Sequence, residues 1–371
     1  MVELADIVRR YGGAYCAQFG EAMLPSHRRA LGDLVACRTE AMGGHVFRCD
    51  RCGHEQYAYH SCRNRHCPKC HTRDIERWLA ERRAELLPVP YFHVVFTLPA
   101  QLHEITRRHQ RRLYGILMKA AAAALIRLAA DPHYVGGLIG VLAVLHTWTR
   151  TLAYHPHVHC LVPAGGLSPD GNQWLPARQS YLVPVRALSK IFRGIFKDLL
   201  RKQLPDAPIA RSVWRKKWVV YCKPTVAGAD SVLTYLARYV HRIAITNRRI
   251  LSIDDGHVTF RYKDAQARQW KTMTLPAEEF LRRFLQHVLP AGFHKVRYYG
   301  LWAPANRHRL RHCQVLLAAD PPADQDHSPE PDLDRHDRGD PDPPGGRTCP
   351  HCGKGILVCV GWVARQQRAP P

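Results

Sequence analysis

The chain has 371 residues, enough for two or three domains, and a formal net charge of +23, which rises to +29 when the acidic residues 320–347 are set aside. A charge of that sign favours nucleic acid as a partner, because each Lys or Arg that meets a phosphate releases a condensed counterion. No apolar run reaches about 18 residues and the N-terminus lacks a signal-peptide pattern, so we expect a cytoplasmic protein without a membrane partner.

The N-terminal part predicts a helix followed by a cysteine-rich module. Apolar residues at helical spacing indicate a docking helix over residues 3–23. From about Cys37 to His71 the chain is rich in Cys, His, Arg and Gly and too irregular for a regular element, which favours a module organised by metal. A further helix is expected over residues 72–87, ending before Pro88.

The middle of the chain predicts strands that alternate with helices. Strands are expected in YFHVVFTL, GLIGVLAVLHTWT, HPHVHCLVP and WVVYC, and a hairpin in ILSIDDGHVTFRYK. Helices are expected over residues 101–129, 184–203 and 229–242. This order of elements predicts an α+β fold with a central antiparallel sheet and helices on one face.

These elements divide the chain into four expected parts. The helix and metal module occupy residues 1–88, and the α+β domain occupies residues 89–315. Residues 316–347 are expected to form a disordered linker, because residues 320–347 are rich in proline and acidic side chains, have almost no apolar residues and cannot repay their ordering entropy. Residues 348–371 form a cysteine-containing tail.

The sequence His155-Pro-His157-Val-His159 is the sharpest feature. On a strand, alternate side chains project from one face, so at least two of these imidazoles can meet one cation while Val158 points into the core. His155 itself, or His146 on the preceding strand, could supply a third ligand, and spacing does not decide between them. The alternative is a His-rich strand that packs without metal.

Tyr235 and Tyr239 are four residues apart and so share one face of a predicted helix. A phenol is a poor nucleophile near neutral pH because its pKa is about 10, but a metal that polarises a phosphate, with Arg238 or Arg242 nearby, would relieve that handicap. A tyrosine pair at this spacing also occurs as ordinary core packing. Its coexistence with the His strand favours the catalytic interpretation.

Cys49-x-x-Cys52 and Cys67-x-x-Cys70 are two pairs with the spacing of structural zinc ligands. Four thiolates would complete a closed tetrahedron with no position for water, so we expect one structural Zn²⁺ held by these residues. Other side chains could replace one ligand or build a second site with Cys37, namely His54, His60, Cys62, His66 and His71.

Near the C-terminus, Cys349-Pro-His351-Cys352 with Cys359 resembles half of a zinc ribbon. It lacks an obvious fourth sulfur, although His351 could complete a set. Whether this segment binds metal stays open at this level.

Several basic residues lie beside these motifs and are candidates for DNA contact. Their alternative is an ordinary solvated basic surface. The candidates are Arg63, Arg65, Lys69, Arg238, Arg242, Arg248 and Arg249.

Together these motifs resemble the IS91 family of rolling-circle transposases, which belong to the His-hydrophobe-His nucleases. The resemblance rests on SCRNRHCPKCH, HTWTRTLAYHPHVHCLVPAGGL, TYLARYVHRIAITNRRI and FHKVRYYGLWA, and extends over about residues 1–315. It implies a zinc-binding N-terminal domain and a nuclease domain over residues 89–315. It also implies a bacterial, nucleoid-associated protein that moves an insertion sequence.

The resemblance further implies that His157 and His159, with His146 as one candidate for the third ligand, hold Mg²⁺ or Mn²⁺ against single-stranded DNA at transposon ends and target. Tyr235 and Tyr239 would then be the nucleophiles that form a 5′-phosphotyrosine link. The nearest alternative is a plasmid or phage replication initiator with the same chemistry. A zinc-dependent DNA-binding protein without catalysis is the alternative from a different class.

Overall fold

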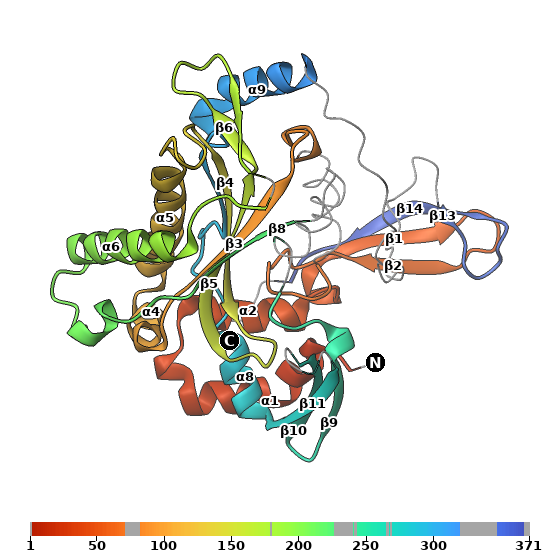
Figure 1. Ribbon diagram of the computed structural model, residues 1–371. Coiled ribbons are helices and arrows are strands. Elements are labelled where there is room, and N and C mark those ends of the chain that lie inside the picture. The colour runs from red at the N-terminus through yellow and green to blue at the C-terminus, as the bar shows by residue number, and fades with distance from the viewer. Residues whose placement is uncertain are drawn as a thin grey trace. The chain divides into compact units, whose positions relative to one another are not determined.

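The structure is a computed structural model in which the described residues are 2–70, 82–178, 180–225, 240, 243–264, 267, 269–319 and 347–366. It contains two compact units (Figure 1). One unit comprises Met1–Glu76, Ile243–Val288 and Ser328–Pro371, and the other comprises Arg77–Arg242 and Leu289–His327. The chain is therefore not divided into consecutive domains as expected, because residues 243–288 and the C-terminal tail fold with the N-terminal module.

The second unit is built on a five-stranded sheet in which every pair of neighbours is antiparallel. Its strands, in spatial order, are β12 (Val296–Gly300), β4 (Gly140–Trp148), β5 (Tyr154–Pro163), β3 (Tyr91–Thr97) and β8 (Val220–Pro224). The α+β prediction with an antiparallel sheet is confirmed. A short hairpin of β6 (Gly165–Leu167) and β7 (Trp174–Pro176) follows β5.

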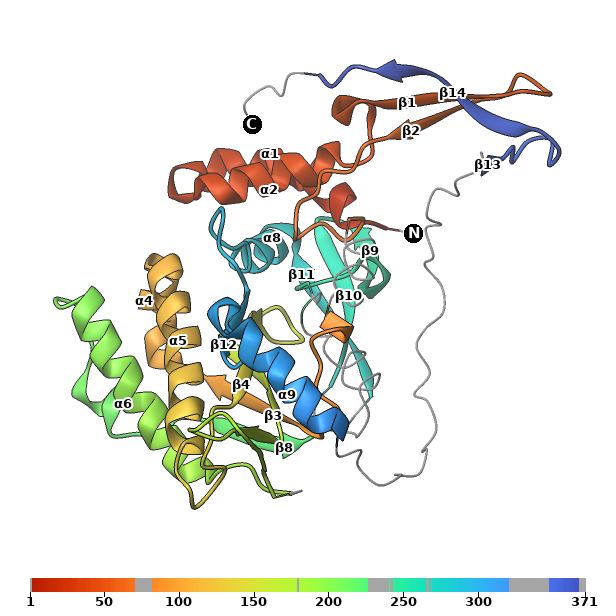
Figure 2. The ribbon, with the colours of Figure 1, turned by 90° about the horizontal axis from the view of Figure 1, so that it is seen from above.

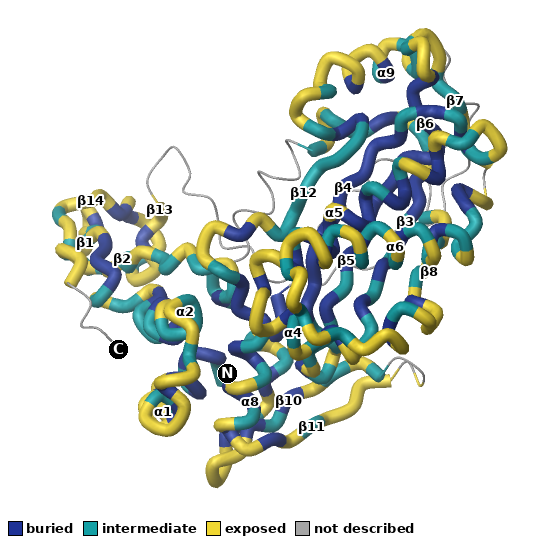
Figure 3. Tube along the Cα trace, turned by 90° about the vertical axis from the view of Figure 1, so that its left-hand side faces the viewer, coloured by how far each residue is buried: buried dark blue, intermediate teal, exposed yellow. Residues whose placement is uncertain are grey.

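One face of this sheet carries the main hydrophobic core. Val158 and Cys160 of β5 are fully buried there, together with alternate residues of β3 and β4. Helices α5 (Gln110–Ala129) and α6 (Val185–Gln203) cover this face, and both lie beside the sheet in Figure 1. In Figure 3 long stretches of β3, β4 and β5 are buried.

The helix expected over residues 101–129 is interrupted. A 3₁₀ turn, Ala100–Leu102, leads into α4 (His103–Arg108), and α5 begins at Gln110. Between them His109 has φ −122° and ψ 43°, outside the helical region, so the hydrogen-bond ladder breaks at that residue.

The opposite face of the sheet holds a second apolar cluster. Leu142 and Val144 of β4 and Leu161 of β5 pack there with Val240 and with Trp302. Helix α9 (Arg307–Ala319) contributes Leu310 and Cys313 to the same cluster. The alternation of side chains along β4 and β5 thus separates two buried surfaces.

Among its described residues, the first unit combines three α-helices with a three-stranded sheet. Helix α1 (Leu4–Phe19) corresponds to the expected docking helix and packs on α2 (Pro25–Ala36) and on α8 (Ala277–Leu285), as Figure 2 shows. The sheet consists of β9 (Ile250–Asp254), β10 (His257–Lys263) and β11 (Trp270–Pro276). The expected hairpin is confirmed as the β9–β10 pair, and β11 extends it.

The two ends of the sequence meet in a four-stranded antiparallel ribbon of the first unit. β1 (Gly44–Cys49) pairs with β2 (Glu55–Tyr59) on one side and with β14 (Ile356–Val363) on the other, and β13 (Arg347–Thr348) follows β14 in the sheet. In Figure 1 the blue β14 runs alongside the red β1. The described part of the expected cysteine-containing tail, residues 348–366, thus contributes a strand to this sheet.

Three expected elements fall mainly outside the described residues: the helices over residues 72–87 and 229–242, and the linker over residues 316–347. The remaining short 3₁₀ turns are Gly20–Ala22, Glu40–Met42, Arg211–Trp214, Asn247–Arg249 and Pro304–Asn306. Among the described helices, none combines the length and apolar character needed to cross a bilayer.

Candidate metal centres

Three histidines converge on the face of the sheet opposite the main core. Antiparallel pairing of β4 and β5 sets His146 directly opposite His157, and His159 opposite Val144. Each of the three imidazoles offers a nitrogen, and these nitrogens all lie within 4.8 Å of one another. One cation can therefore meet all three side chains.

The placement follows from the alternation of side chains along β5. Val158 and Cys160 point into the main core, as predicted for Val158, so His157 and His159 must project from the other face. His155 lies near, with its ring centroid 5.2 Å from that of His157, but it is not among the three convergent side chains. The structure thus brings in His146 as the third member.

A fourth histidine, which the sequence analysis did not single out, orients one of the three. His93 of β3 pairs with Leu161, so it shares the face of His159. Its Nε2 lies 2.8 Å from His159 Nδ1, and the two rings are stacked with centroids 5.0 Å apart. Burial lowers the pKa of His93 to about 4, so the ring is neutral. In the sequence, the one indication of this role is that His93 is a single histidine in an otherwise apolar predicted strand.

The other rings are also held in place. His157 Nδ1 hydrogen-bonds the carbonyl of His155 at 2.6 Å, so a metal would meet the Nε2 atom of His157. His146 is 2% exposed, and its ring stacks on Trp148 with centroids 4.7 Å apart. Ring orientation is therefore fixed by protein contacts.

The predicted nucleophiles Tyr235 and Tyr239 lie outside the described residues, and so do Arg238 and Arg242. The next residue after Tyr239 that the structure describes is Val240, which is 3% exposed within the second apolar cluster.

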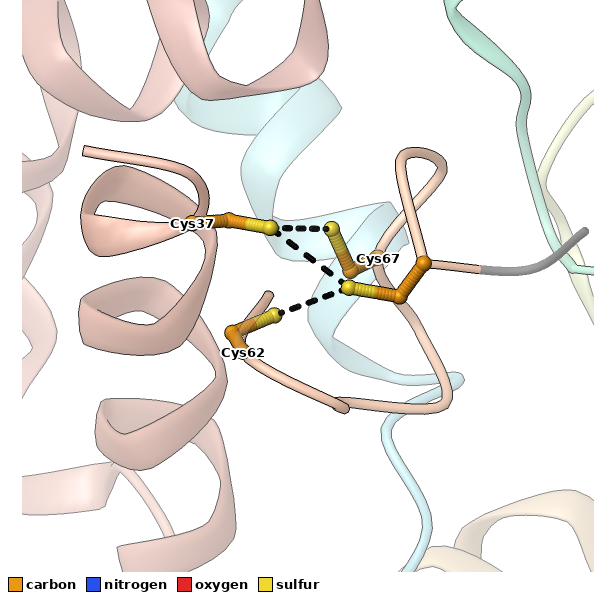
Figure 4. A group of neighbouring side chains, drawn as sticks. Cys37, Cys62 and Cys67 are labelled. Atoms are coloured by element: carbon orange, nitrogen blue, oxygen red, sulfur yellow. Dashed lines mark hydrogen bonds between the residues drawn. The ribbon is translucent and has the colours of Figure 1, made fainter. Parts of the chain in front are cut away.

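Four cysteines of the first unit form a separate group: Cys37, Cys62, Cys67 and Cys70. Cys37 follows the end of α2, and the other three come from the irregular segment after β2. Figure 4 shows the side chains of Cys37, Cys62 and Cys67 pointing toward one another.

The sulfur positions of this group fit zinc. Cys37 Sγ lies 3.5 Å from Cys70 Sγ and 3.6 Å from Cys67 Sγ, and Cys62 Sγ lies 3.5 Å from Cys70 Sγ. Sulfurs bound to one Zn²⁺ at about 2.3 Å sit about 3.8 Å apart at the corners of a tetrahedron. The Asn64 N–H also donates to Cys62 Sγ at 3.5 Å, which favours a thiolate.

Hydrogen bonds among the four sulfurs lower the pKa of Cys37 and Cys70 and raise the pKa of Cys62 and Cys67, so two of the thiols are favoured as thiolates. Hydrogen bonds from its neighbours, Cys37 first, hold the pKa of Cys70 far below its usual range. A hydrogen bond from Cys62 is the main reason that the pKa of Cys37 falls to about 7. The thiolate is the form that binds metal.

The expected zinc site of Cys49, Cys52, Cys67 and Cys70 is wrong in its grouping. Cys67 and Cys70 join Cys37 and Cys62, whereas Cys49 and Cys52 lie with Cys349 and Cys352. The physical reason is that β1 pairs with both β2 and β14, which brings the C-terminal cysteines to the end of β1 where Cys49 lies.

The basic candidates differ in their surroundings. Arg63, Arg65 and Arg248 are exposed. Lys69 forms an ion pair with Glu3 at 2.6 Å. Arg249 donates to the carbonyls of Arg261, at 2.9 Å, and Ala244, at 3.2 Å, so its guanidinium supports the fold around β10.

Comparison with known proteins gives two family matches on this chain. Residues 140–309, which include the three convergent histidines, match the model of a putative transposase, and residues 7–98 match that of a transposase zinc-binding domain. No solved structure matches the chain.

Two relatives agree with these matches. A putative transposase of Sinorhizobium fredii, y4qJ, is 43% identical, covering 96% of this chain and 94% of the relative. The transposase for insertion sequence element IS801 of Pseudomonas savastanoi pv. phaseolicola is 28% identical, covering 73% of this chain and 68% of the relative.

A zinc-binding domain joined to a transposase domain defines a protein that acts on DNA during transposition. The chain belongs to the IS91 family of transposases.

Proposed function

We propose that this transposase cleaves and rejoins single-stranded DNA through a 5′-phosphotyrosine intermediate, at a divalent metal held by His146, His157 and His159. The convergence of these three imidazoles within 4.8 Å is the observation that carries the proposal. Mg²⁺ or Mn²⁺ at this centre would polarise the scissile phosphate and align it for in-line attack.

The histidine contacts support a ligand role. A metal-binding imidazole usually donates its other ring N–H to a carbonyl or another acceptor, which fixes its tautomer and direction. His157 has such a bond to the His155 carbonyl, and His159 has one to His93. Because His93 is buried and neutral, its Nε2 can accept the proton of His159 Nδ1. Both ligand rings then present Nε2 to the ion.

The chemistry assigned to the tyrosines is a balanced exchange of ester bonds. The phenol of Tyr235 or Tyr239 gives up its proton as its oxygen bonds to phosphorus, the bond from phosphorus to the 3′ oxygen breaks, and that oxygen takes up a proton and leaves as a 3′-hydroxyl. A 3′-hydroxyl of another strand reverses the step. The phosphotyrosine conserves the phosphodiester energy, so rejoining needs no ATP.

The position of Val240 supports bringing a tyrosine to the histidines. Val240 packs in one cluster with Leu142, Val144 and Leu161, and these three sit on the sheet face that also carries His157 and His159. Tyr239 directly precedes Val240, and consecutive Cα atoms are about 3.8 Å apart.

Two alternatives remain distinct hypotheses. A replication initiator of a plasmid or phage would use the same chemistry, but the matched relatives carry transposase names. In a DNA-binding protein without catalysis, the histidines would only stabilise the fold. Packing alone does not require three imidazole nitrogens to lie within 4.8 Å of one another.

The test is capture of the covalent intermediate. The full chain is incubated with Mn²⁺ and a fluorescent single-stranded oligonucleotide pool with randomised positions, then denatured in SDS. The wild type should give a labelled protein adduct. The double variant Tyr235→Phe, Tyr239→Phe should give none, while Tyr57→Phe, an exposed tyrosine of β2, should behave as wild type. No adduct with the wild type would favour the non-catalytic alternative.

The single variants then assign the nucleophile. If Tyr235→Phe alone abolishes the adduct, Tyr235 cleaves first, and the converse holds for Tyr239. If only the double variant loses the adduct, either phenol suffices. An adduct that survives the double variant would refute the proposed nucleophiles.

A further inference from the structure

Two segments from opposite ends of the sequence have the same form. Cys49-x-x-Cys52 is followed by Gly53, and Cys349-x-x-Cys352 by Gly353. Both glycines have positive φ, +71° and +65°, which glycine adopts readily. Each donates its N–H to the carbonyl of the first cysteine, at 3.1 Å and 2.9 Å. Each segment is thus a tight turn, here called a knuckle, that presents two sulfurs.

The two knuckles bring their four sulfurs together. Cys49 Sγ lies 3.7 Å from Cys352 Sγ, and Cys52 Sγ lies 3.7 Å from Cys349 Sγ. Both distances match the edge of about 3.8 Å expected for four sulfurs around one Zn²⁺. A disulfide needs about 2.05 Å, so neither pair is bonded.

Backbone donors surround the sulfurs. The N–H groups of Arg51 and Cys52 donate to Cys49 Sγ at 3.4 and 3.5 Å, and the Gly355 N–H donates to Cys352 Sγ at 3.3 Å. Such bonds stabilise a thiolate, which is the form that ligates zinc. Each knuckle therefore has a sulfur that accepts backbone hydrogen bonds, as expected for a zinc ligand.

The residues around the four cysteines allow the two knuckles to approach closely. A Cβ at Gly355 would collide with Cys49 Sγ, so only glycine fits there. Asp50 exchanges two hydrogen bonds with the backbone of Ile356, at 2.8 and 3.1 Å. Leu357 is buried against Cys49 and Cys349.

We propose that Cys49, Cys52, Cys349 and Cys352 bind a structural Zn²⁺ that joins the two ends of the sequence in one zinc ribbon. This ion is additional to the one that Cys37, Cys62, Cys67 and Cys70 can hold. The matched zinc-binding domain ends at residue 98, so it contains neither Cys349 nor Cys352. The proposal does not depend on the proposed catalytic function.

The donor set defines the role of the ion. Four thiolates fill the tetrahedron, so no position is left for water or substrate and the ion stabilises the fold. Cys49 and Cys352 are 303 residues apart, so the metal acts as a long-range cross-link that holds β14 against β1. Losing either knuckle should release the C-terminal segment from the ribbon.

The first test counts zinc in the full chain by elemental mass spectrometry. With the histidine centre occupied by Mn²⁺, the two cysteine groups predict two zinc ions per chain in the wild type and one in Cys349→Ser, Cys352→Ser. Cys359→Ser is the matched control: Cys359 is exposed, lies in the same C-terminal segment and is outside the group, so two ions should remain. One ion in the wild type, or two in the double variant, overturns the proposal.

The second test uses only the wild type, so it does not depend on how a variant folds. The zinc-loaded chain is treated with iodoacetamide and its labelled cysteines are located by peptide mass spectrometry. Cys52 and Cys359 are both exposed, so burial alone would leave both reactive. Bound zinc should protect Cys52 until a chelator is added, while Cys359 reacts throughout. Equal labelling of the two before chelation overturns the proposal.

Discussion

His93 Nε2 lies 2.8 Å from His159 Nδ1, and the two imidazole rings are stacked. The two residues are 66 positions apart in the sequence, and they meet because β3 and β5 are adjacent in the sheet. In the proposed metal centre His93 is a positioning residue, since it fixes the tautomer and direction of His159 without meeting the ion.

We predict that His93→Phe, which keeps a ring but loses the acceptor nitrogen, weakens Mn²⁺ binding by about 10- to 100-fold. Adduct formation should recover at saturating Mn²⁺, because the ligand itself is intact. His93→Gln, which restores an acceptor, should recover part of the affinity. Calorimetric titration with Mn²⁺ measures the affinity of each variant for the metal. His133→Ala, which removes an exposed histidine, is the control, and equal affinities in all variants would contradict the prediction.

The third ligand is tested by comparing His146→Ala with His155→Ala. His146 belongs to the convergent group and His155 does not, so only the first variant should lose Mn²⁺ affinity and adduct formation. The His155 carbonyl, which accepts the bond from His157 Nδ1, remains when the side chain is removed. Loss of binding in His155→Ala with retention in His146→Ala would reverse the assignment.

Cys160 is predicted to be a core residue and no metal ligand, although it follows His159. It is fully buried among apolar side chains, and burial raises the pKa of its thiol. Cys160→Ser would place a hydroxyl in that core and should cost about 1–3 kcal/mol in the free energy of unfolding. Urea denaturation measures the loss, and the zinc content should not change. A serine variant as stable as the wild type would contradict this placement.

Gly300 closes β12 with φ +60°, and a Cβ there would collide with the Ile139 carbonyl oxygen. We expect Gly300→Ala to destabilise the chain by more than about 1 kcal/mol. Gly194 lies on the exposed face of α6, and a Cβ added there would meet no other atom within 4 Å. Gly194→Ala should therefore stabilise the chain by about 0.5–1 kcal/mol. Thermal unfolding of both variants checks the opposite signs.

Local patterns predicted the second unit well. The strands around Val94, Val144 and Val158 and the helix α6 were all expected, because apolar alternation and helical spacing are properties of short segments. Side-chain alternation likewise predicted that Val158 enters the core. The break at His109 was missed, because a single non-helical residue leaves the apolar spacing almost unchanged.

Long-range pairing was harder to predict. The repeated Cys-x-x-Cys-Gly at residues 49–53 and 349–353 was a signal that the two knuckles belong together. Proximity in sequence favoured Cys67 and Cys70 as the partners of Cys49 instead. The pairing of β1 with β14 overrides that proximity, since strand partners can come from any distance along the chain.

The sequence by itself determined the types of chemistry present: imidazoles alternating on a strand, thiols in close pairs, phenols at helical spacing and a strongly basic composition. Which of these side chains share a site was decided by the tertiary structure. Sheet register selected His146 over His155 and added His93, and the meeting of the two chain ends sorted the cysteines into two groups. A metal site requires atoms within a few ångströms of one ion, and only the folded arrangement of distant segments sets those distances.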